Sequence, residues 1–405
     1  MTSPLSGVRV LDITRVLAGP SATQILGDLG ADVIKIERPG SGDDSRGLGP
    51  PYLHDASGKE TPESAYYLSA NRNKRSVTLN LTSPEGQELA RKLIAHCDVV
   101  VENFRTGNLR QYGLAYEQIK DRFPRLVYCS ITGFGQTGPY AKRAGYDYLV
   151  QGIGGIMSVT GEPDGPPEKV GVGIADLMTG MYSVIAILSA LRHRDATGAG
   201  QYIDMALFDT QVAWLSYVGQ NYLTSGEVPR RRGNQHPNIM PYQVFGAADG
   251  LLILAVGNDA QFERFCVFCG RPELARDTRF ATNAQRLKHR DILTPIIADI
   301  ISGHPIRYWV EGLTAVNVPC SPINSVDQVF ADPQVKARGM EIAMPHPDSG
   351  GTGVHLIGSP IKMSETPVSY RRPPPTLGQH TDEVLREVLG LKDSEISGLR
   401  AKRVI

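Results

Sequence analysis

The sequence predicts an α/β protein whose larger domain is built on a parallel β-sheet. Strand-like and helix-like segments alternate through the first third of the chain, beginning with an apolar strand at 8–12, a helix at 19–29 and a strand at 31–37. Such alternation is typical of parallel sheets covered by helices on both faces. The chain has 405 residues, of which 41% are hydrophobic and 21% are charged, as in a soluble globular protein of two or three domains.

The alternation continues further along the chain. A strand is predicted at 76–80, followed by a helix from 83 to about 96. This helix opens with Ser-Pro, and proline near the first helical position loses no N–H group that the helix needs. Two further strands end at Asn103 and just before the loop 132–140. Because ligands of parallel sheets bind at the carboxyl ends of the strands, Arg38, Asn103 and this loop are candidates for a binding site.

The second half of the chain changes in character. A long apolar helix is predicted from Asp176 to about residue 193. The stretch 225–236 is rich in Arg, Gly and Pro, which predicts a linker. The segment that follows it in sequence has one strand-like run and two helical patterns. From about residue 329 the chain becomes irregular, and residues 371–375 (RRPPP) predict an extended strap before a last helix.

Charge and hydropathy narrow the class of protein. The 42 basic and 42 acidic residues balance, so no overall field attracts nucleic acid or an anionic membrane. The N-terminus lacks a basic stretch followed by an apolar run. The longest apolar run, 181–191, is shorter than the about 20 residues that span a bilayer. We therefore expect a cytoplasmic enzyme with no nucleic-acid or membrane partner.

The five cysteines predict neither a disulfide framework nor a metal site, since their number is odd and the chain is large. Cys266 and Cys269 form a CxxC motif, but a zinc site needs a second pair of ligands and none follows nearby. Because the two thiols lie in a helical pattern, we expect them to pack together in a core.

Residues 133–138 match the pattern GxGxxG after a strand, which is one feature of a dinucleotide-binding site. Such a site also needs a helix that opens at the glycines and an acid about 20 residues further on. Here Pro139 follows, and no acid is suitably placed. A glycine-rich turn is therefore the preferred interpretation, and an NAD-dependent oxidoreductase is an alternative that a nicotinamide titration tests.

Basic and amide groups cluster beside three predicted strands. Residues 71–75 (NRNKR) place three cations just before one strand, Arg38 ends another, and Arg105 follows Asn103 and Phe104 after a third. Arginine forks suit phosphate geometry, and an aromatic ring suits a heterocyclic base. The pattern predicts a site for a ligand that carries both groups, and a solvated basic turn is the competing interpretation.

Asp176 stands between two apolar stretches in the run GVGIADLMTG. A buried carboxylate needs compensation, so an acid in such a place is seldom without a function. If it begins a helix, backbone N–H groups and the helix dipole favour its ionised form. Two interpretations stay open: a reactive carboxylate and a helix N-cap.

Several long motifs together resemble the family III (CaiB/BaiF-type) CoA-transferases. They are GVRVLDITRVLAGPSATQILGDLGADVIKIERPGSGDDSR at the N-terminus, then NRNKRS, VENFRTG, GYDYLVQGIGG and GVGIADLMTG, and LGQHT near the C-terminus. They occur in order along essentially the whole chain. The resemblance implies a Rossmann-like large domain made of residues 1–224 and 329–405 and a smaller α/β domain at 225–328. It also implies a ring-shaped chain that interlocks with a second copy in a homodimer.

The resemblance assigns roles by position. Asp176 matches a nucleophile that forms an aspartyl-CoA thioester, and Arg143 stands beside a basic contact of the family that falls on Ala144. Coenzyme A enters as part of the acyl-CoA substrate, and no metal or tightly bound cofactor is implied. The other positions that match the CoA site are Val16, Leu17, Arg38, Arg72, Asn73, Lys74, Arg75, Asn103, Phe104 and Arg105, with Tyr146 and Asp147 beside the thioester.

Within the family, the runs GNQHPNIMPYQVF and RPPPTLGQHT resemble the branch that moves CoA from succinyl-CoA to dicarboxylic acids. A dicarboxylate needs a cation for its distal carboxylate. The loop 233–237 is not glycine-rich, which disfavours formyl and oxalyl substrates. For the arginines at 230–232 a solvated linker is the competing interpretation. The candidates for substrate contact are Arg46, Arg232, Asn234 and His236.

Two alternatives within acyl-CoA chemistry stay open. The chain also resembles α-methylacyl-CoA racemases and isomerases, which use a His-Asp pair. The position of that histidine is Tyr146 here, and a tyrosine with a pKa near 10 is a poor general base at neutral pH. The other alternative is an acyl-CoA binding protein without catalysis. The sequence therefore predicts a CoA-transferase.

Overall fold

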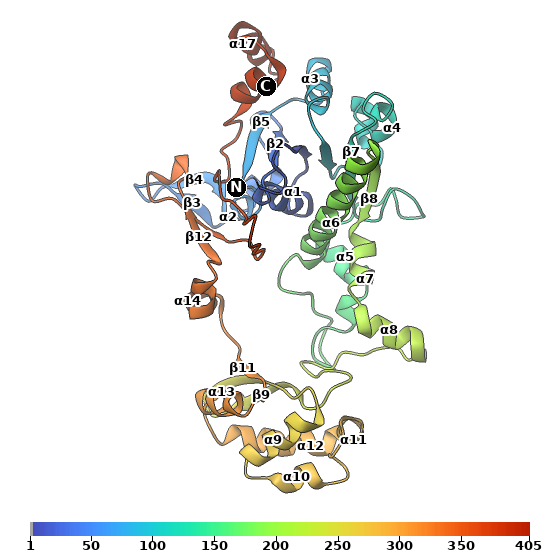
Figure 1. Ribbon diagram of the computed structural model, residues 1–405, viewed down its shortest axis with the longest axis vertical. Coiled ribbons are helices and arrows are strands. Elements are labelled where there is room, and N and C mark those ends of the chain that lie inside the picture. Colours follow the sequence, from blue (N-terminus) through green and yellow to red (C-terminus); the bar gives the residue numbers. More distant parts are fainter. Residues whose placement is uncertain (1–2) are drawn as a thin grey trace. The chain divides into compact units, whose positions relative to one another are not determined.

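The computed structural model describes residues 3–405, which fold into two compact units (Figure 1). The chain passes from the larger unit into the smaller one twice and returns each time. The larger unit contains residues up to 156, 169–226 and 333–405, and the smaller unit contains 157–168 and 227–332.

A six-stranded parallel sheet forms the centre of the larger unit, which confirms the prediction from strand–helix alternation. Its strand order is β5-β2-β1-β6-β7-β8, and every neighbouring pair is parallel. The chain order reverses between β1 and β6, so the loops after these two strands diverge at the carboxyl edge. The strands are β1 (Arg9–Ile13), β2 (Asp32–Glu37), β5 (Lys74–Thr78), β6 (Val99–Glu102), β7 (Val127–Thr132) and β8 (Tyr202–Ala206).

Helices and two hairpins complete the larger unit. The helices are α1 (Ala18–Asp28), α2 (Ala65–Ser69), α3 (Pro84–Ile94), α4 (Tyr116–Ile119), α5 (Asp147–Ile153), α6 (Ile174–Thr197), α7 (Leu207–Ala213), α8 (Ser216–Ser225), α15 (Pro333–Ala337), α16 (Thr381–Leu389) and α17 (Asp393–Ala401). The hairpins pair β3 (Tyr52–His54) with β4 (Glu60–Ser64) and β12 (Glu341–Met344) with β13 (Val354–Ile357). Short 3₁₀ turns are η1 (Asp44–Gly47), η2 (Asn108–Tyr112), η3 (Ile156–Ser158) and η4 (Pro347–Ser349).

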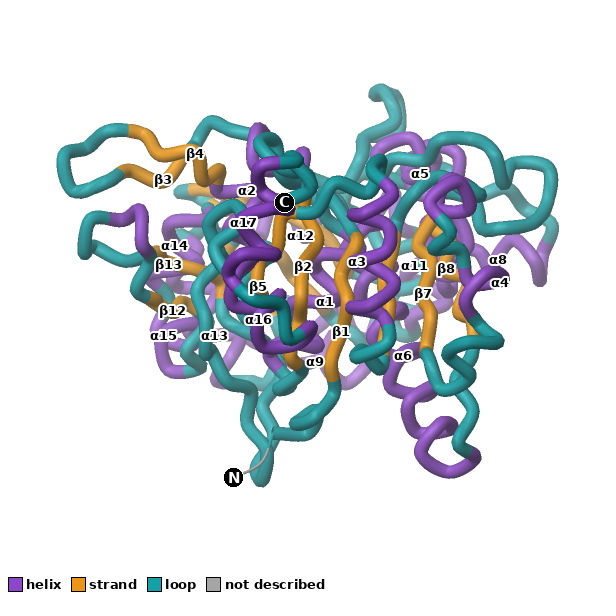
Figure 2. The backbone as a smooth tube through the Cα atoms, turned by 90° about the horizontal axis from the view of Figure 1, so that it is seen from above, coloured by secondary structure: helices purple, strands orange, loops and turns teal. Residues whose placement is uncertain are grey.

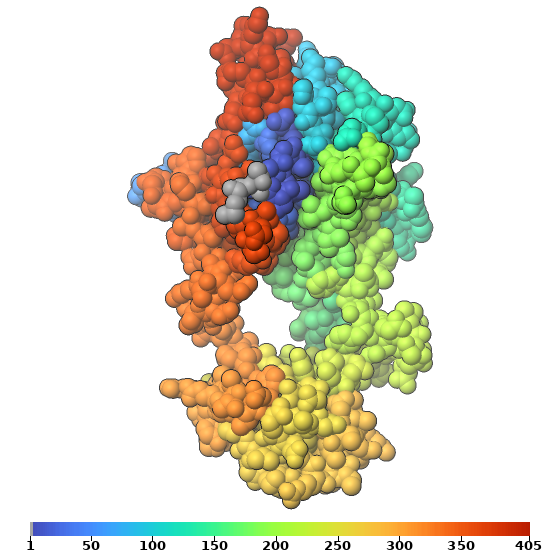
Figure 3. Space-filling model, in the orientation of Figure 1, coloured from blue at the N-terminus to red at the C-terminus, as the bar shows by residue number. Residues whose placement is uncertain are grey.

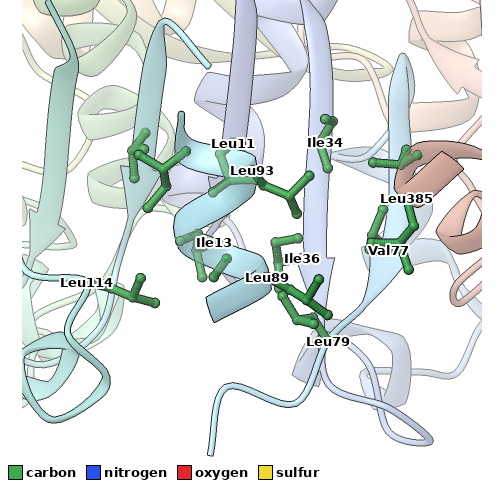
Figure 4. Close-up of a cluster of buried hydrophobic side chains, with 14 of the residues drawn as sticks. Leu11, Ile13, Ile34, Ile36, Val77, Leu79, Leu89, Leu93, Leu114 and Leu385 are labelled. Atoms are coloured by element: carbon green, nitrogen blue, oxygen red, sulfur yellow. The ribbon is translucent and has the colours of Figure 1, made fainter. Parts of the chain in front are cut away.

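Helices cover both faces of the sheet because alternate residues of each strand point to opposite sides. On one face, Leu11 and Ile34 pack with Leu93 of α3 in the cluster shown in Figure 4. α16 contributes to the same cluster, and Figure 2 shows α3 and α16 in front of the strands. On the other face, Val33 packs in a second cluster with Ile187 of α6. The core of the unit therefore lies in two layers, one on each side of the sheet.

Local sequence explains where the two long helices begin and end. The Ser83 hydroxyl caps α3 by accepting the Gly86 N–H at 3.0 Å, and proline takes the first helical position. α6 ends at Gly198, whose φ of 82° is the left-handed conformation that glycine favours there. Among the described helices, α6 alone is long and apolar enough to cross a membrane. Its residues Ile187 and Leu191 are buried in the second cluster, as expected of a core helix.

The basic segment 71–75 lies at the amino edge of the sheet, so the prediction that it converges with Arg38 at the strand ends is wrong. Lys74 is the first residue of β5 and pairs with Val33, near the start of β2. A segment that precedes a strand of a parallel sheet lies at the amino edge, opposite the edge at which Arg38 follows β2. The three cations are at most 4% exposed and form ion pairs, of which two are buried while the carboxylate that pairs with Arg75 is 29% exposed. These pairs are Arg72–Asp28, Lys74–Asp12 and Arg75–Asp32, at 2.6, 3.0 and 2.6 Å.

The same segment fastens the returning C-terminal chain to the sheet. The Oδ1 atom of Asn73 accepts the N–H groups of Arg371 and Arg372 at 2.7 and 3.1 Å. The backbone N–H of Asn73 donates to the Arg372 carbonyl at 2.9 Å. Arg72 donates to the carbonyl of Ile357 at 2.8 Å. These contacts explain how the two ends of the chain build one unit.

The smaller unit has a separate core around Phe265 and Trp309. Cys266 is buried in that core with Cys269 packed against it, and both are free thiols, as predicted. The segment 157–168, which the sequence placed in the large domain, belongs here because Arg231 donates to its carbonyl groups. The strands, in the antiparallel order β11-β10-β9, are β9 (Tyr242–Ala247), β10 (Gly250–Ala255) and β11 (Cys320–Pro322). The helices are α9 (Asp259–Phe268), α10 (Pro272–Arg276), α11 (Asn283–Lys288), α12 (Arg290–Ser302), α13 (Ile306–Ala315) and α14 (Val326–Ala331).

Candidate active site at the carboxyl edge of the sheet

A cavity of about 280 Å³ opens at the carboxyl edge of the parallel sheet. Residues after β1, β6 and β7 line it together with the start of α6. This is where the strand order reverses, the position at which sheets of this type bind ligands. The predicted site residues that line this cavity are Val16, Leu17, Asn103, Phe104, Arg105, Arg143, Tyr146 and Asp176.

Asp176 is the third residue of α6 and stands partly buried in the cavity wall. Burial raises its pKa, and the charge of Asp147 raises it further, to about 7. Such a carboxyl group is more basic than an ordinary aspartate and is still ionised in part at neutral pH. The helix-cap interpretation fails, because Gly173 occupies the N-cap position.

A second carboxylate, Asp147 at the start of α5, supports the N-terminus of α6. Its Oδ2 atom accepts the backbone N–H groups of Ala175 and Asp176 at 2.8 and 3.1 Å. Its Oδ1 atom accepts a hydrogen bond from the buried Gln151 side chain at 2.6 Å. Asp147 thus fixes the main chain at Asp176 and also supplies the charge that raises the pKa of Asp176.

The loop after β1, which lines the cavity, is held in a strained conformation. Val16 has a φ of 71°, a region that β-branched residues rarely adopt and that is found at functional sites. Its N–H donates to Asp43 Oδ1 at 3.1 Å. The Asn103 amide accepts the Arg15 N–H at 2.9 Å and donates to the Arg15 carbonyl oxygen at 2.7 Å. Asn103 therefore shapes the cavity through the main chain of the neighbouring loop.

A second cavity, of about 440 Å³, lies along the same edge of the sheet. Arg15 and Phe104 line both cavities, so the two are neighbours. Arg38, at the end of β2, lines the second one, as does Arg403 near the C-terminus. No sequence motif marks Arg403, because only the return of the chain brings it beside the end of β2. The apolar residues that line this cavity are Ile13, Ile36, Leu79, Leu81 and Phe104.

Tyr66 of α2 is another residue that the sequence analysis missed. Burial raises its pKa to about 12, and the charges of Asp176 and Asp147 act in the same direction. Its phenol is therefore neutral at physiological pH, and the charges of the two carboxylates contribute to its raised pKa. No motif marks this tyrosine, since its relation to Asp176 arises only in the folded chain.

Arg46, predicted to contact the substrate, is instead buried in a structural cluster. Its guanidinium donates to Glu37 at 2.8 and 2.9 Å and to both oxygens of Glu63 at 2.7 Å. It also donates to the Pro375 carbonyl at 3.0 Å and packs over the Tyr67 ring. All its nitrogen atoms are thereby occupied, and it lines neither cavity. The structure corrects the prediction for Arg46 as it does for Arg72, Asn73, Lys74 and Arg75.

The remaining substrate candidates belong to the smaller unit. The Arg232 carbonyl accepts the N–H of Gln235 at 3.1 Å, and the His236 carbonyl accepts a hydrogen bond from Arg290 at 2.7 Å. Burial and the charge of Arg290 lower the pKa of His236. The contact of Arg232, Asn234 and His236 with a substrate stays a prediction.

Two features of the described chain bear on cofactors. Within residues 3–405, no group of three or more His, Cys, Asp and Glu side chains is placed to hold a metal ion. After β7 no helix opens at the glycines of 133–138, and the next helix is α5, which begins at Asp147. The helix that a dinucleotide fingerprint requires is therefore missing at that position.

The fold and the site together define an α/β protein with a carboxyl group of raised pKa in a cavity at the point where the strand order reverses. The family model described as CoA-transferase family III matches residues 5–381. The chain is 52% identical to succinate–glutarate CoA-transferase of Agrobacterium fabrum, over 95% of this chain and 96% of that protein. It is 43% identical to human succinyl-CoA:glutarate CoA-transferase, over 99% of this chain and 90% of that protein. A solved CaiB/BaiF family protein from Brucella suis superposes with a TM-score of 0.84 at 48% identity, covering 96% of this chain and all of that one.

The chain belongs to CoA-transferase family III. It is therefore a CoA-transferase, an enzyme whose substrates include CoA thioesters. The resemblance drawn from the sequence motifs is confirmed.

Asp147→Asn is expected to lower the pKa of Asp176 from about 7, because it removes the charge that opposes ionisation. The pKa stays above 3.8, since burial is the larger cause. ¹³C NMR titration of labelled aspartate carboxyl groups measures it, with Asp176→Asn to assign the signal. Glu117→Gln on α4 is the matched control for a loss of one negative charge. If the pKa of Asp176 is unchanged in Asp147→Asn, the charge of Asp147 is not a cause of the raised pKa and the prediction is contradicted.

Proposed function

We propose that this enzyme transfers CoA from succinyl-CoA to a dicarboxylic acid through a covalent aspartyl-CoA thioester on Asp176. The observation that carries the proposal is the carboxyl group of Asp176, whose pKa is raised to about 7, in a cavity at the carboxyl edge of the sheet. Relatives named for succinyl-CoA, succinate and glutarate support the choice of substrates.

The chemistry follows from a carboxylate presented to a thioester. Asp176 attacks the donor carbonyl carbon, the C–S bond breaks, and a mixed anhydride and CoA thiolate form. The thiolate then attacks the aspartyl carbonyl carbon and releases the donor acid, which leaves the aspartyl-CoA thioester. The acceptor carboxylate attacks that thioester and again forms an anhydride and a thiolate. Attack of the thiolate on the acceptor acyl carbon gives the new acyl-CoA and frees Asp176.

The residues around Asp176 suit these steps. The raised pKa makes the carboxylate more basic, and the Asp147 hydrogen bonds to the backbone hold it at the start of α6. Tyr66 stays protonated and interacts electrostatically with Asp176, so we assign its phenol O–H the role of a hydrogen-bond donor to the reacting groups. Such a donor stabilises negative charge that develops on an oxygen atom in the tetrahedral intermediates.

The two cavities suit the two ends of CoA. The larger cavity has an apolar lining with Phe104 for the adenine ring and Arg403 for the 3′-phosphate. The smaller cavity contains Asp176 and receives the thiol end. Arg15 and Arg38 lie where the two cavities adjoin and face the diphosphate. Besides Arg15, the cations that line the cavity of Asp176 are Arg105 and Arg143, and we assign these two to the distal carboxylate of the acceptor.

We further propose that the enzyme is a homodimer whose interface includes α6, α7 and α8. Large apolar side chains on these helices are exposed, which in soluble proteins marks an interaction surface. The three helices form the green to yellow-green side of the larger unit in Figure 3. The exposed residues are Met181, Tyr182, Ile185, Val212, Trp214, Tyr217, Tyr222 and Leu223. The family resemblance implies that the partner is a second, interlocked copy, and the cytoplasmic location stays a prediction.

Light scattering at decreasing protein concentration tests the dimer. Interlocked chains cannot separate without unfolding, so we expect twice the mass of one chain at every concentration down to the nanomolar range. A mass that falls to that of one chain on dilution contradicts the interlocked arrangement, and a monomer at high concentration contradicts the dimer.

Asp176→Ala is expected to reduce transfer by at least about a thousandfold while CoA affinity is retained, because the nucleophile is removed and the cavities remain. Hydroxylamine added during turnover is expected to modify Asp176 in the wild type, which mass spectrometry of peptides detects. Asp393→Ala on the first turn of α17 is the control and retains activity. Modification of another residue, or activity in Asp176→Ala, overturns the mechanism.

A panel of acceptor acids with succinyl-CoA as donor tests the substrate class. We expect five- and six-carbon dicarboxylic acids to give product thioesters, read by mass, and the matching monocarboxylic acids to react much less. The same assay in D₂O distinguishes a racemase, which exchanges the α-proton of an acyl-CoA without any acceptor. Exchange without transfer refutes the proposed function.

A further inference from the structure

Two arginines and one carboxylate meet where the two cavities adjoin. Arg15 Nη1 lies 3.0 Å from Asp44 Oδ2, and Arg38 Nη2 is hydrogen-bonded to the other oxygen, Oδ1. Asp44 lines the cavity of Asp176, Arg38 lines the neighbouring cavity, and Arg15 lines both. The Asp44 carboxylate therefore bridges the two cations that the proposed function assigns to a diphosphate.

The bridge formed by Asp44 differs in burial from the neighbouring ion pair of Asp43. The side chains of Arg15, Arg38 and Asp44 are 36%, 53% and 48% exposed, and pairs with such exposure contribute little to stability. The adjacent Asp43 is 0% exposed, pairs with the buried Lys35 at 2.8 Å, and its pKa is held well below the usual range. Asp43 is therefore a fixed part of the fold, whereas the contacts of Asp44 break at low cost.

A phosphate group competes directly with Asp44 for these two arginines. A diphosphate offers more acceptor oxygens and more negative charge than one carboxylate, and guanidinium groups match its geometry. It also has to lie between the cavities if the adenine and the thiol occupy one each. Both ligands cannot hold the same N–H groups at once, so binding of the diphosphate requires the release of Asp44.

We propose that Asp44 is an internal stand-in for a phosphate group of the acyl-CoA. Its carboxylate keeps Arg15 and Arg38 oriented between the cavities and is displaced when the diphosphate binds. Displacement reduces the net gain on binding, so Asp44 lowers the affinity of the enzyme for CoA and eases the release of the product thioester. This inference rests on the proposed function, since it needs a diphosphate at these arginines.

The test is a calorimetric titration of CoA into the wild type, Asp44→Asn and Asp44→Ser at several salt concentrations. Loss of the competing carboxylate is expected to tighten CoA binding about fivefold at low salt. The slope of log affinity against log salt becomes steeper, because two unpaired cations then meet the phosphates. Glu117→Gln, which removes one negative charge from an exposed pair on α4, leaves affinity and slope nearly unchanged.

A double-variant cycle locates the effect. In the Arg38→Gln background CoA binds more weakly, and adding Asp44→Asn there tightens binding much less than it does in the wild type. Unchanged or weaker CoA binding in both Asp44 variants overturns the inference, as does equal tightening with and without Arg38. If the wild type itself does not bind CoA, the proposed function fails; if it binds and transfers CoA while the Asp44 variants gain no affinity, only the role of Asp44 fails.

Discussion

The active-site loop depends on a row of buried charges that crosses three adjacent strands. Lys35 of β2 pairs with Asp43 at 2.8 Å and donates to the Thr14 carbonyl at 2.9 Å. Lys74 of β5 pairs with Asp12 of β1 at 3.0 Å. Breaking a buried pair by removing one partner costs about 3–5 kcal/mol, since the other charge is left uncompensated. The net contribution of each pair to stability is smaller than this. Together, however, the pairs hold the loop after β1 in one conformation, which includes the positive φ of Val16.

Asp176 shows the energetic cost of burying a carboxyl group beside another negative charge in a folded chain. Its pKa in the folded protein, about 7, lies above the ordinary value of 3.8, so the folded state binds the proton more tightly than the unfolded state. The stabilising contribution of the protonated form is complete below pH 4 and is lost as the pH rises through about 7. At neutral pH Asp176 is partly ionised, so its burial and the neighbouring charge of Asp147 lower the free energy of unfolding. The hydrogen bonds from the start of α6 to Asp147 offset that cost locally and keep the two carboxylates in place.

Sequence patterns predicted the parallel sheet and much of the cavity because both follow from local periodicity. A residue such as Arg38 or Asn103 that closes a buried strand must lie at the carboxyl edge, whatever the rest of the chain does. The basic run at 71–75 leads into its strand, whose first residue is Lys74, and so lies at the opposite edge, where it binds the returning chain. Arg403 in the second cavity and the electrostatic interaction of Tyr66 with Asp176 stayed unrecognised for a related reason: both arise from long-range packing that no local pattern encodes. The partners of Arg46 likewise come from separate segments, since Glu37, Glu63 and Pro375 lie 9, 17 and 329 positions away in sequence.

Asp43 and Asp44 are adjacent aspartates whose different burial gives them different roles. Both carboxylates pair with cations of the same loop and sheet edge, at similar distances. Around Asp43, water is excluded and Lys35 and two N–H groups surround the carboxylate, so its ionised form is part of the fold. Around Asp44, solvent screens both ion pairs, so their strength is small and a more highly charged ligand can replace the carboxylate. Asp43 thus fixes the backbone of the loop that carries Arg15, whereas Asp44 pairs with the Arg15 side chain and can be replaced. The Arg15 guanidinium therefore stays in place while its anionic partner changes.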